Sequence, residues 1–171
     1  MDYLKQFILP IEGLKNGFHS YNFRLDSQFF NHFELSPINN GVITVTVDLN
    51  KEDHIYSFCF NITGFVNVDC DRCLASVELP IFGAYNVVVK QKDEVSDDPD
   101  LIFISPEVHE YNIADLLYEF ACVSLPIRNL IDCDNMENPP CNFELLKYYQ
   151  NTVNNKEDNS TWDILKNLKT N

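Results

Sequence analysis

The feature that most constrains the fold is a strict alternation of apolar and polar residues over two neighbouring segments. In residues 43–49, Ile, Val, Val and Leu alternate with Thr, Thr and Asp, and residues 56–62 repeat the pattern with Tyr, Phe, Phe and Ile. A period of two is typical of a half-buried β-strand. Because the polar residues 50–53 separate the two segments, the sequence predicts an antiparallel hairpin.

Further segments continue this β-rich pattern on both sides of the hairpin. Short turns separate most of them where a parallel fold would place helices, so a doubly wound parallel sheet is disfavoured. We therefore expect an α+β fold: a largely antiparallel β-sheet or partial barrel of five or more strands, with a few short helices. The additional strands are predicted at residues 18–25, 65–69, 74–79, 85–90 and 101–104.

Two short helices are predicted beside the sheet. Asp26 is placed to cap the first, whose apolar members are Phe29, Phe30 and Phe33. Asn112 is the expected N-cap of the second, whose apolar face starts at Ile113. The second helix should end before Leu125-Pro126, because proline disfavours helical geometry in the residue that precedes it.

The chain is expected to form one α+β domain over residues 1–149. Residues 150–159 are almost wholly polar and predict a linker. Residues 160–169 begin with a Ser-x-x-Asp helix start and carry a short apolar stripe, which predicts a C-terminal docking helix anchored by Trp162. So short a helix is marginal alone and is expected to dock on its own domain or on a partner.

The chain is strongly acidic, with 12 Lys and Arg against 26 Asp and Glu and a formal charge of −14. This charge disfavours binding to a phosphate backbone and favours a basic protein partner. The acidic run at residues 93–100 is expected to be a solvated loop. The chain starts without a secretion signal and has no run of eighteen apolar residues, so we expect a soluble cytoplasmic protein with no membrane contact.

Six cysteines in a chain expected in the cytoplasm favour buried, metal-bound or catalytic thiols over disulfides. Cys70 and Cys73 form a Cys-x-x-Cys turn between two predicted strands, the setting of half a zinc knuckle. Cys133 and Cys141 could supply the other pair, giving four thiolates around a structural Zn²⁺. Alternatively, the first pair only tightens a β-turn and the second pair lies in loops. Cys59 and Cys122 are expected to be structural thiols.

Catalysis is the less favoured interpretation. The Cys-x-x-Cys could be a redox couple with Arg72 lowering a thiolate pKa, but no helix follows Cys73, and Asp69 and Asp71 lie beside the motif. The histidines are scattered, and the sequence contains no His-x-x-x-His, Gly-x-Ser-x-Gly or glycine-rich phosphate loop. We therefore expect no catalytic residues and no small-molecule substrate, with a small thiol oxidoreductase as the alternative. The four histidines are His19, His32, His54 and His109.

Three segments together resemble the YceD family, the large ribosomal RNA subunit accumulation proteins. Residues 68–74, Val-Asp-Cys-Asp-Arg-Cys-Leu, resemble the family's Cys-x-Arg-Cys stretch. Residues 113–126 resemble its helix that runs into Leu-Pro, and residues 162–168, Trp-Asp-Ile-Leu-Lys-Asn-Leu, resemble its closing segment. Their order and spacing cover most of residues 60–171.

The resemblance implies a non-enzymatic ribosome-biogenesis factor that supports the synthesis, processing or stability of 23S ribosomal RNA. Genes of this family commonly lie beside one for a small basic zinc-binding protein of the large subunit. A basic large-subunit ribosomal protein is therefore the expected partner, because complementary charge speeds encounter. Contact with 23S rRNA or the pre-ribosome is expected to be indirect.

Overall fold

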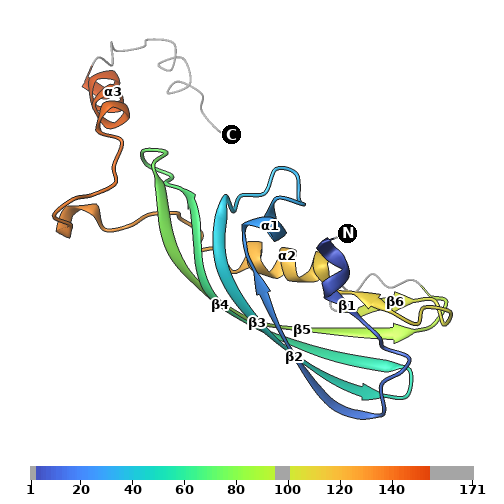
Figure 1. Ribbon diagram of the computed structural model, residues 1–171. Helices are drawn as coiled ribbons and strands as arrows, with labels where there is room; N and C mark the ends of the chain where they lie inside the picture. The colour runs from blue at the N-terminus through green and yellow to red at the C-terminus, as the bar shows by residue number, and fades with distance from the viewer. Residues whose placement is uncertain (1–2, 95–100, 155–171) are drawn as a thin grey trace, which may run out of the picture.

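The structure of the protein, a computed structural model, describes residues 3–94 and 101–154 of the 171. It confirms an α+β fold built around one long, curved sheet (Figure 1). The helical segments are η1 (Tyr3–Phe7), α1 (Ser27–Phe30), α2 (Ala114–Val123), η2 (Cys133–Asn135) and α3 (Phe143–Asn154). The strands are β1 (Ile8–Leu9), β2 (Gly17–Leu25), β3 (Asn40–Glu52), β4 (Ile55–Asp69), β5 (Ser76–Gln91), β6 (Leu101–Ile104) and β7 (Tyr111–Asn112).

The main sheet has five strands in the order β2-β3-β4-β5-β6. Strands β2 to β5 pair antiparallel as successive hairpins, and β6 pairs parallel with β5. The short strands β1 and β7 form a separate antiparallel pair. In the part of the chain described, the sheet ends at β2 and β6 without closing into a barrel.

The predicted hairpin is confirmed, but the strands are longer than the sequence pattern indicates. Strand β3 continues to Glu52, and Asp53, with φ +53°, turns the chain with His54. The segments predicted separately at 74–79 and 85–90 form one strand, β5, that passes through Pro80 and Gly83. It does so because β4 is almost as long and pairs with it in one register from Ile55↔Lys90 to Asp69↔Ser76.

The hydrophobic core lies on one face of the sheet, where α2 and the N-terminal segment cover it (Figure 1). Leu117 and Ala121 of α2 are buried against this face. Aromatic rings extend the packing: Phe120 stacks on Tyr85 of β5 at 4.6 Å between centroids, and Tyr118 stacks on Phe33 at 3.9 Å. Stacked rings add to the free energy of burial, so α2 is fixed on the sheet.

The predicted helix starts are confirmed with one adjustment. Asp26 Oδ1 accepts hydrogen bonds from the Gln28 and Phe29 backbone N–H groups at 3.0 and 3.4 Å, as a helix cap does. Asn112 belongs to β7, and the cap position of α2 is Ile113. The Asn112 side chain nevertheless accepts a bond from the Ala114 N–H at 2.9 Å. Helix α2 ends at Val123, ahead of Leu125-Pro126 as predicted.

The predicted linker at 150–159 begins inside a helix, because α3 continues to Asn154. Once a helix is started, each added residue gains a backbone hydrogen bond, so a polar sequence can prolong it. The remainder of the linker, the docking helix predicted at 160–169 and residues 95–100 of the acidic loop lie outside the described residues. None of the described helices is both long and apolar enough to cross a membrane.

Candidate thiol site at the end of the sheet

The Cys-x-x-Cys motif lies in the turn between β4 and β5, as the sequence predicts. The Cys70 N–H donates to the Ala75 carbonyl at 2.8 Å, and the Leu74 N–H donates to the Cys70 carbonyl at 2.9 Å. Leu74 closes the turn in the left-handed region with φ +56°. Both thiols are buried, each with 1% of the residue surface exposed. The motif therefore stands at a strand-to-strand turn and not at a helix N-terminus.

The chain returns to this turn after α2. The Asp71 N–H donates to the Asn129 carbonyl at 3.1 Å, and the Asn129 N–H donates to Asp71 Oδ2 at 2.7 Å. Just beyond, Cys133 opens η2 and is 8% exposed, and half-buried Cys141 lies two residues before α3. These bonds bring both cysteine pairs to the same end of the sheet.

The four predicted ligands form a chain of thiol contacts. Cys73 is hydrogen-bonded to the thiols of Cys70 and Cys141. Cys141 is hydrogen-bonded in turn to Cys133. Arg72, which is exposed, donates from Nη2 to Cys141 Sγ at 3.7 Å. The structure thus joins two pairs that lie some sixty residues apart in sequence.

The surroundings of Cys73 and Cys141 shift their pKa values in opposite directions. The backbone N–H groups of Asn142 and Ala75 donate to the Cys73 sulfur and lower the pKa of this thiol. The contact with Cys133 and burial raise the pKa of Cys141, against the opposing effect of Arg72. Cys73 is therefore the thiol whose deprotonated form the fold favours.

The donor chemistry of this cluster fits a soft divalent metal, since thiolates are the ligands of closed structural zinc sites. As placed in the structure, however, no group of three or more His, Cys, Asp or Glu side chains among the described residues could hold a metal ion. In the structure each thiol contacts the next one along a line: Cys70 contacts Cys73, Cys73 contacts Cys141, and Cys141 contacts Cys133. Sequence reasoning named all four cysteines and Arg72, but it missed Asn129 and the two backbone donors, for which side-chain identity gives no signal.

The same geometry disfavours thiol exchange. A catalytic Cys-x-x-Cys needs an exposed attacking thiol in an electropositive setting. Cys70 and Cys73 are each 1% exposed, and the chain leaves the motif as strand β5. A disulfide substrate could not approach either sulfur without opening the turn.

Among the described residues, the histidines and the remaining cysteines form no second cluster. His19 and His32 each bond a backbone carbonyl four residues earlier, at 2.8 and 2.7 Å. His54 bonds Gln91 at 3.4 Å, and His109 pairs with Glu12. Cys59 lies half-buried on the open face of the sheet, and half-buried Cys122 has its pKa raised by burial. These side chains are explained by local contacts.

The open face of the sheet carries a depression of about 370 Å³ lined by residues of β2 to β5, among them Phe18, Asp48 and Cys59. Its carboxylate, Asp48, accepts hydrogen bonds from Ser20 at 2.7 Å and Asn61 at 3.5 Å. Besides Asp48 and the thiol of Cys59, no titratable side chain lines the depression.

Together, the open sheet, the buried thiol turn and the helix that covers the core define a small α+β protein. Residues 58–169 match the family described as Large ribosomal RNA subunit accumulation protein YceD. The match covers β4 from Phe58 onward, the thiol turn, α2 and the second cysteine pair, and takes in more than half of the chain. The chain belongs to the YceD family. It matches no curated protein and no solved structure.

Proposed function

We propose that this protein is a cytoplasmic, non-enzymatic ribosome-biogenesis factor that supports 23S rRNA synthesis, processing or stability. The family match over residues 58–169 carries the proposal, because the family is described by large ribosomal RNA accumulation. We further propose that it acts through contacts with a basic protein of the large subunit, and that its contact with rRNA or the pre-ribosome is indirect. The surface charge supports this second step.

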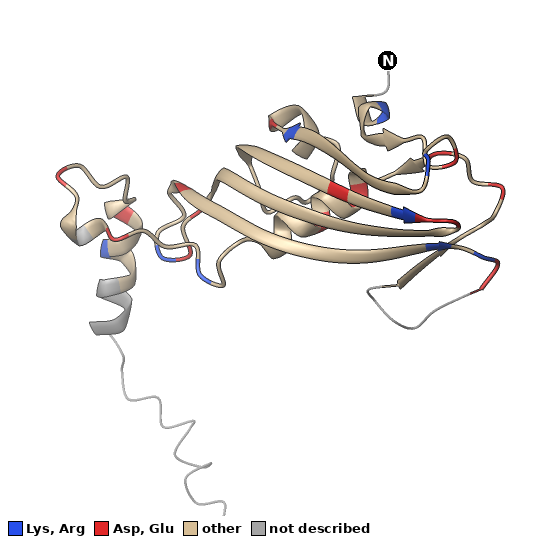
Figure 2. Ribbon diagram, turned by 90° about the horizontal axis from the view of Figure 1, so that it is seen from below, with Lys and Arg blue, Asp and Glu red and all other residues tan. Residues whose placement is uncertain are grey.

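Lys and Arg residues are sparse and scattered along the ribbon, and Asp and Glu residues recur along its loops (Figure 2). Among the described residues, Lys92–Glu94 is the one ion pair between a Lys or Arg and a carboxylate. Most carboxylates of the described residues therefore have no close Lys or Arg to neutralise their charge. Such a surface repels a phosphate backbone and attracts a basic protein at long range.

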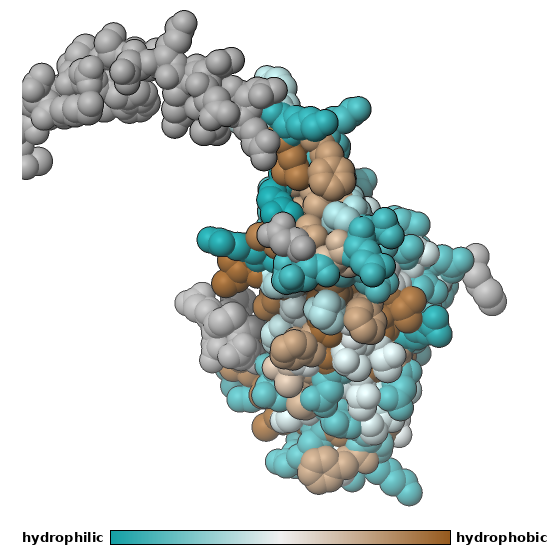
Figure 3. Space-filling view, turned by 90° about the vertical axis from the view of Figure 1, so that its left-hand side faces the viewer, coloured by the Kyte–Doolittle hydropathy of each residue, from teal (hydrophilic) through white to brown (hydrophobic). Residues whose placement is uncertain are grey.

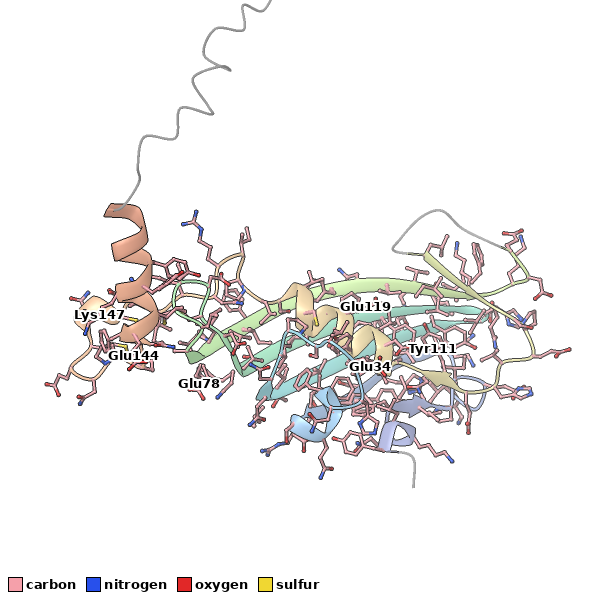
Figure 4. The ribbon with its side chains drawn as sticks, turned by 90° about the horizontal axis from the view of Figure 1, so that it is seen from above. Glu34, Glu78, Tyr111, Glu119, Glu144 and Lys147 are labelled. Carbon is pink, nitrogen blue, oxygen red and sulfur yellow. The ribbon has the colours of Figure 1, made fainter. Side chains whose placement is uncertain are left out.

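Three acidic residues lie on or near α2. Asp115 and Glu119 are exposed one helical turn apart, and both raise the pKa of Tyr111 through their negative charge, after the larger effect of burial. Glu34 and Glu119 lie on the same side of the sheet (Figure 4), where the neighbouring rings Phe33 and Tyr118 stack. We place the contact with the basic partner on this surface, the acidic α2 face: Glu34, Asp115 and Glu119.

We propose a second protein-contact surface at the end of the molecule that carries the thiol turn and α3. Apolar side chains are interleaved with hydrophilic ones on the surface that carries the thiol turn and α3 (Figure 3). Interface cores are enriched in aromatic residues and Met. The exposed apolar side chains of this end include Leu74, Ile127, Met136 and Phe143.

Depletion of the protein in its native cell tests the first step. We expect a selective fall in 23S rRNA and in free large subunits on a sucrose gradient, with 16S rRNA as the internal reference. Re-expression of the wild-type chain should restore both. An unchanged 23S level and subunit profile after complete depletion would refute the proposed function.

Binding of purified basic large-subunit proteins tests the second step. We expect association at low salt that weakens at high salt, because exposed charges are screened within about 10 Å at 0.1 M. Asp115→Lys/Glu119→Lys should weaken it. The matched control is Glu52→Lys/Glu107→Lys, which changes the net charge equally at two exposed positions elsewhere. Equal loss in both variants would remove the acidic α2 face from the proposal, and no association at low salt would remove the partner.

A further inference from the structure

We propose that the open face of the main sheet binds a second copy of this chain, face to face about a two-fold axis. Helix α2 and the N-terminal segment cover the opposite, core-bearing face (Figure 1). In the part of the chain described, no helix lies over the open face of β2 to β5, which is the side seen in Figure 2. The inference is independent of the proposed function, and the dimer leaves the acidic α2 face free.

The middle of this face carries almost no net charge, unlike the chain as a whole. Between the rows of Phe65 and Ser57, Arg24 and Asp48 are the charged side chains that point outward from the described strands β2 to β5, and their signs are opposite. The whole chain has a formal charge of −14, so two copies repel each other at most other surfaces. A basic partner would gain little here. The charge distribution therefore favours a second copy as the occupant.

Exposed apolar side chains gather at one end of this stretch. Register pairing places Val42 and Pro80 on either side of Phe65, and it places Phe82 beside Thr63, two residues before Phe65. Phe65 is 54% exposed and Phe82 is 80% exposed. The cores of protein interfaces are enriched in aromatic residues and depleted of charged ones. This end of the face therefore has the composition of an interface core.

The other end of the same stretch carries the depression of about 370 Å³, which Ser57 and Asn86 help to line. A two-fold axis in the plane of the sheet, crossing the strands at Asn61, exchanges the two ends. By register, Phe65 of one copy then lies over Ser57 of the other, and Phe82 lies over Asn86. A two-fold contact is isologous, so the projecting rings of each copy meet the depression of the other.

The same axis brings the two charges together. Arg24 of one copy lies over Ser20 of the other, and Ser20 is the register neighbour of Asp48. Among the described residues, neither Arg24 nor Asp48 has an ion-pair partner within its own chain. Symmetry forms the Arg24–Asp48 contact twice. The face is therefore complementary to itself in charge as well as in shape.

The contact is large enough for a dimer, but not for a tight one. Residues 57 to 65 of β4 and the width of four strands give each copy about 31 Å by about 19 Å, roughly 600 Å². The curvature of the sheet confines the contact to this stretch (Figure 1). Specific interfaces bury about 600 to 1,000 Å² on each partner. We therefore expect a dimer that forms in the micromolar range.

Sedimentation equilibrium of the full-length protein is the first experiment. The mass should rise from one chain to two with concentration, and should do so at lower concentration in high salt, because salt screens the repulsion between the acidic copies. Binding of a basic partner has the opposite salt dependence, so the two proposals fail separately. A mass of one chain at every concentration and salt level would refute the dimer.

Phe65→Asp/Phe82→Asp should have the mass of one chain, with circular dichroism and a melting temperature that show it to be folded. The matched control Leu35→Asp/Ile127→Asp adds the same charge at two fully exposed apolar positions outside the sheet. It should dimerise as the wild type does. Dimerisation of the Phe65/Phe82 variant at wild-type strength would overturn the proposal.

An exchange of charges tests the two-fold arrangement. Arg24→Asp and Asp48→Arg each place like charges together twice, and each should raise the dissociation constant of the dimer about tenfold. The double variant Arg24→Asp/Asp48→Arg restores opposite charges and should regain the wild-type constant. A double variant that dimerises no better than either single variant would contradict this arrangement.

The unmutated chain provides a readout at the face itself. Alkylation of Cys59, followed by peptide mass spectrometry, should slow over the concentrations at which the mass doubles, because Cys59 lines the depression. Half-buried Cys122 of α2 should keep its rate. A doubled mass with an unchanged Cys59 rate would mean that the copies associate elsewhere. Slow alkylation at the mass of one chain would mean that residues 155–171 of the same chain cover the face. Either outcome would overturn the proposal.

Discussion

Asp71 and Asn129 bond each other in both directions although 58 residues separate them. The Asp71 N–H donates to the Asn129 carbonyl at 3.1 Å, and the Asp71 carboxylate accepts from the Asn129 N–H at 2.7 Å. The pair fastens the chain after α2 to the thiol turn without using a cysteine. Its contribution can therefore be measured apart from that of the thiols.

Asp71→Ala should lower the free energy of unfolding by about 1 kcal/mol, the worth of one partly exposed hydrogen bond to a charged group. It removes the acceptor of the Asn129 N–H but leaves the backbone bond in the other direction. Urea unfolding measures the change. Glu107→Ala, another exposed carboxylate outside this contact, is the control. Equal midpoints for the two variants would show that the contact does not stabilise the fold.

Gly64→Ala should be strongly destabilising because β3 and β4 approach too closely for a methyl group. A Cβ at this position would lie 2.3 Å from the Val42 carbonyl oxygen and 2.7 Å from Ile43 Cα, both backbone atoms. The strands must separate, at a cost of about 2 kcal/mol or more.

Thermal unfolding of Gly64→Ala and Gly13→Ala tests this expectation. Gly13 is the matched control, since its added Cβ would meet nothing nearer than the Pro10 oxygen at 3.8 Å. Its melting temperature should stay close to that of the wild type. A Gly64 variant as stable as the Gly13 variant would contradict the close approach of the two strands.

The sequence predicts a strand well where the alternation of apolar and polar residues alone determines it. It predicts a strand less well where pairing with the neighbouring strand determines its length. Alternation in residues 43–49 and 56–62 predicts the hairpin because one face of each strand must be buried. It could not show that β5 continues through Pro80, since proline usually argues against a central strand. The neighbouring strand determines that β5 continues, because Phe65 of β4 lies opposite Pro80 and the pairing extends on both sides of it.

The candidate site shows the same limit. The Cys70/Cys73 turn is predictable because the motif lies between two strand patterns. The pairing with Cys133 and Cys141 is not, because it depends on the path of the chain after α2 and on backbone bonds such as Asp71–Asn129. The burial of Lys51 was also not predicted. It could have been, because Lys51 lies two residues beyond Leu49 and so faces the same buried side of β3 as the apolar residues of 43–49.

Lys51→Met should destabilise the protein by about 3 kcal/mol, because buried carbonyls would lose a charged donor. Lys51 is 7% exposed, and its Nζ donates to the carbonyls of Ile11, Leu14 and Glu12 at 2.8, 2.9 and 3.3 Å. Methionine keeps the apolar stem but donates nothing. Lys147→Met, an exposed position on α3, is the control for loss of charge. Similar urea midpoints for both variants would mean that the three carbonyls find other partners.

Burial of Tyr111 makes the stability of the fold sensitive to alkaline pH. Burial first, then the charges of Asp115 and Glu119, raise the pKa of Tyr111 above its ordinary value of 10.0. The folded state thus holds the phenolic proton more tightly than the unfolded state. The resulting stability is fully present below pH 10 and is lost as the pH rises through the folded-state pKa.

Tyr111→Phe should therefore flatten the fall in unfolding free energy between pH 9 and pH 11, measured by urea titration at each pH. The wild type should keep a steeper fall because it retains the Tyr111 hydroxyl. Tyr3, Tyr21, Tyr56 and Tyr118, whose pKa values burial also raises, contribute equally in both proteins. Tyr149→Phe, which changes an exposed ring on α3, should follow the wild type. If Tyr111→Phe and wild type lost stability in parallel, the Tyr111 hydroxyl would not be the buried proton that α2 and its carboxylates hold in place.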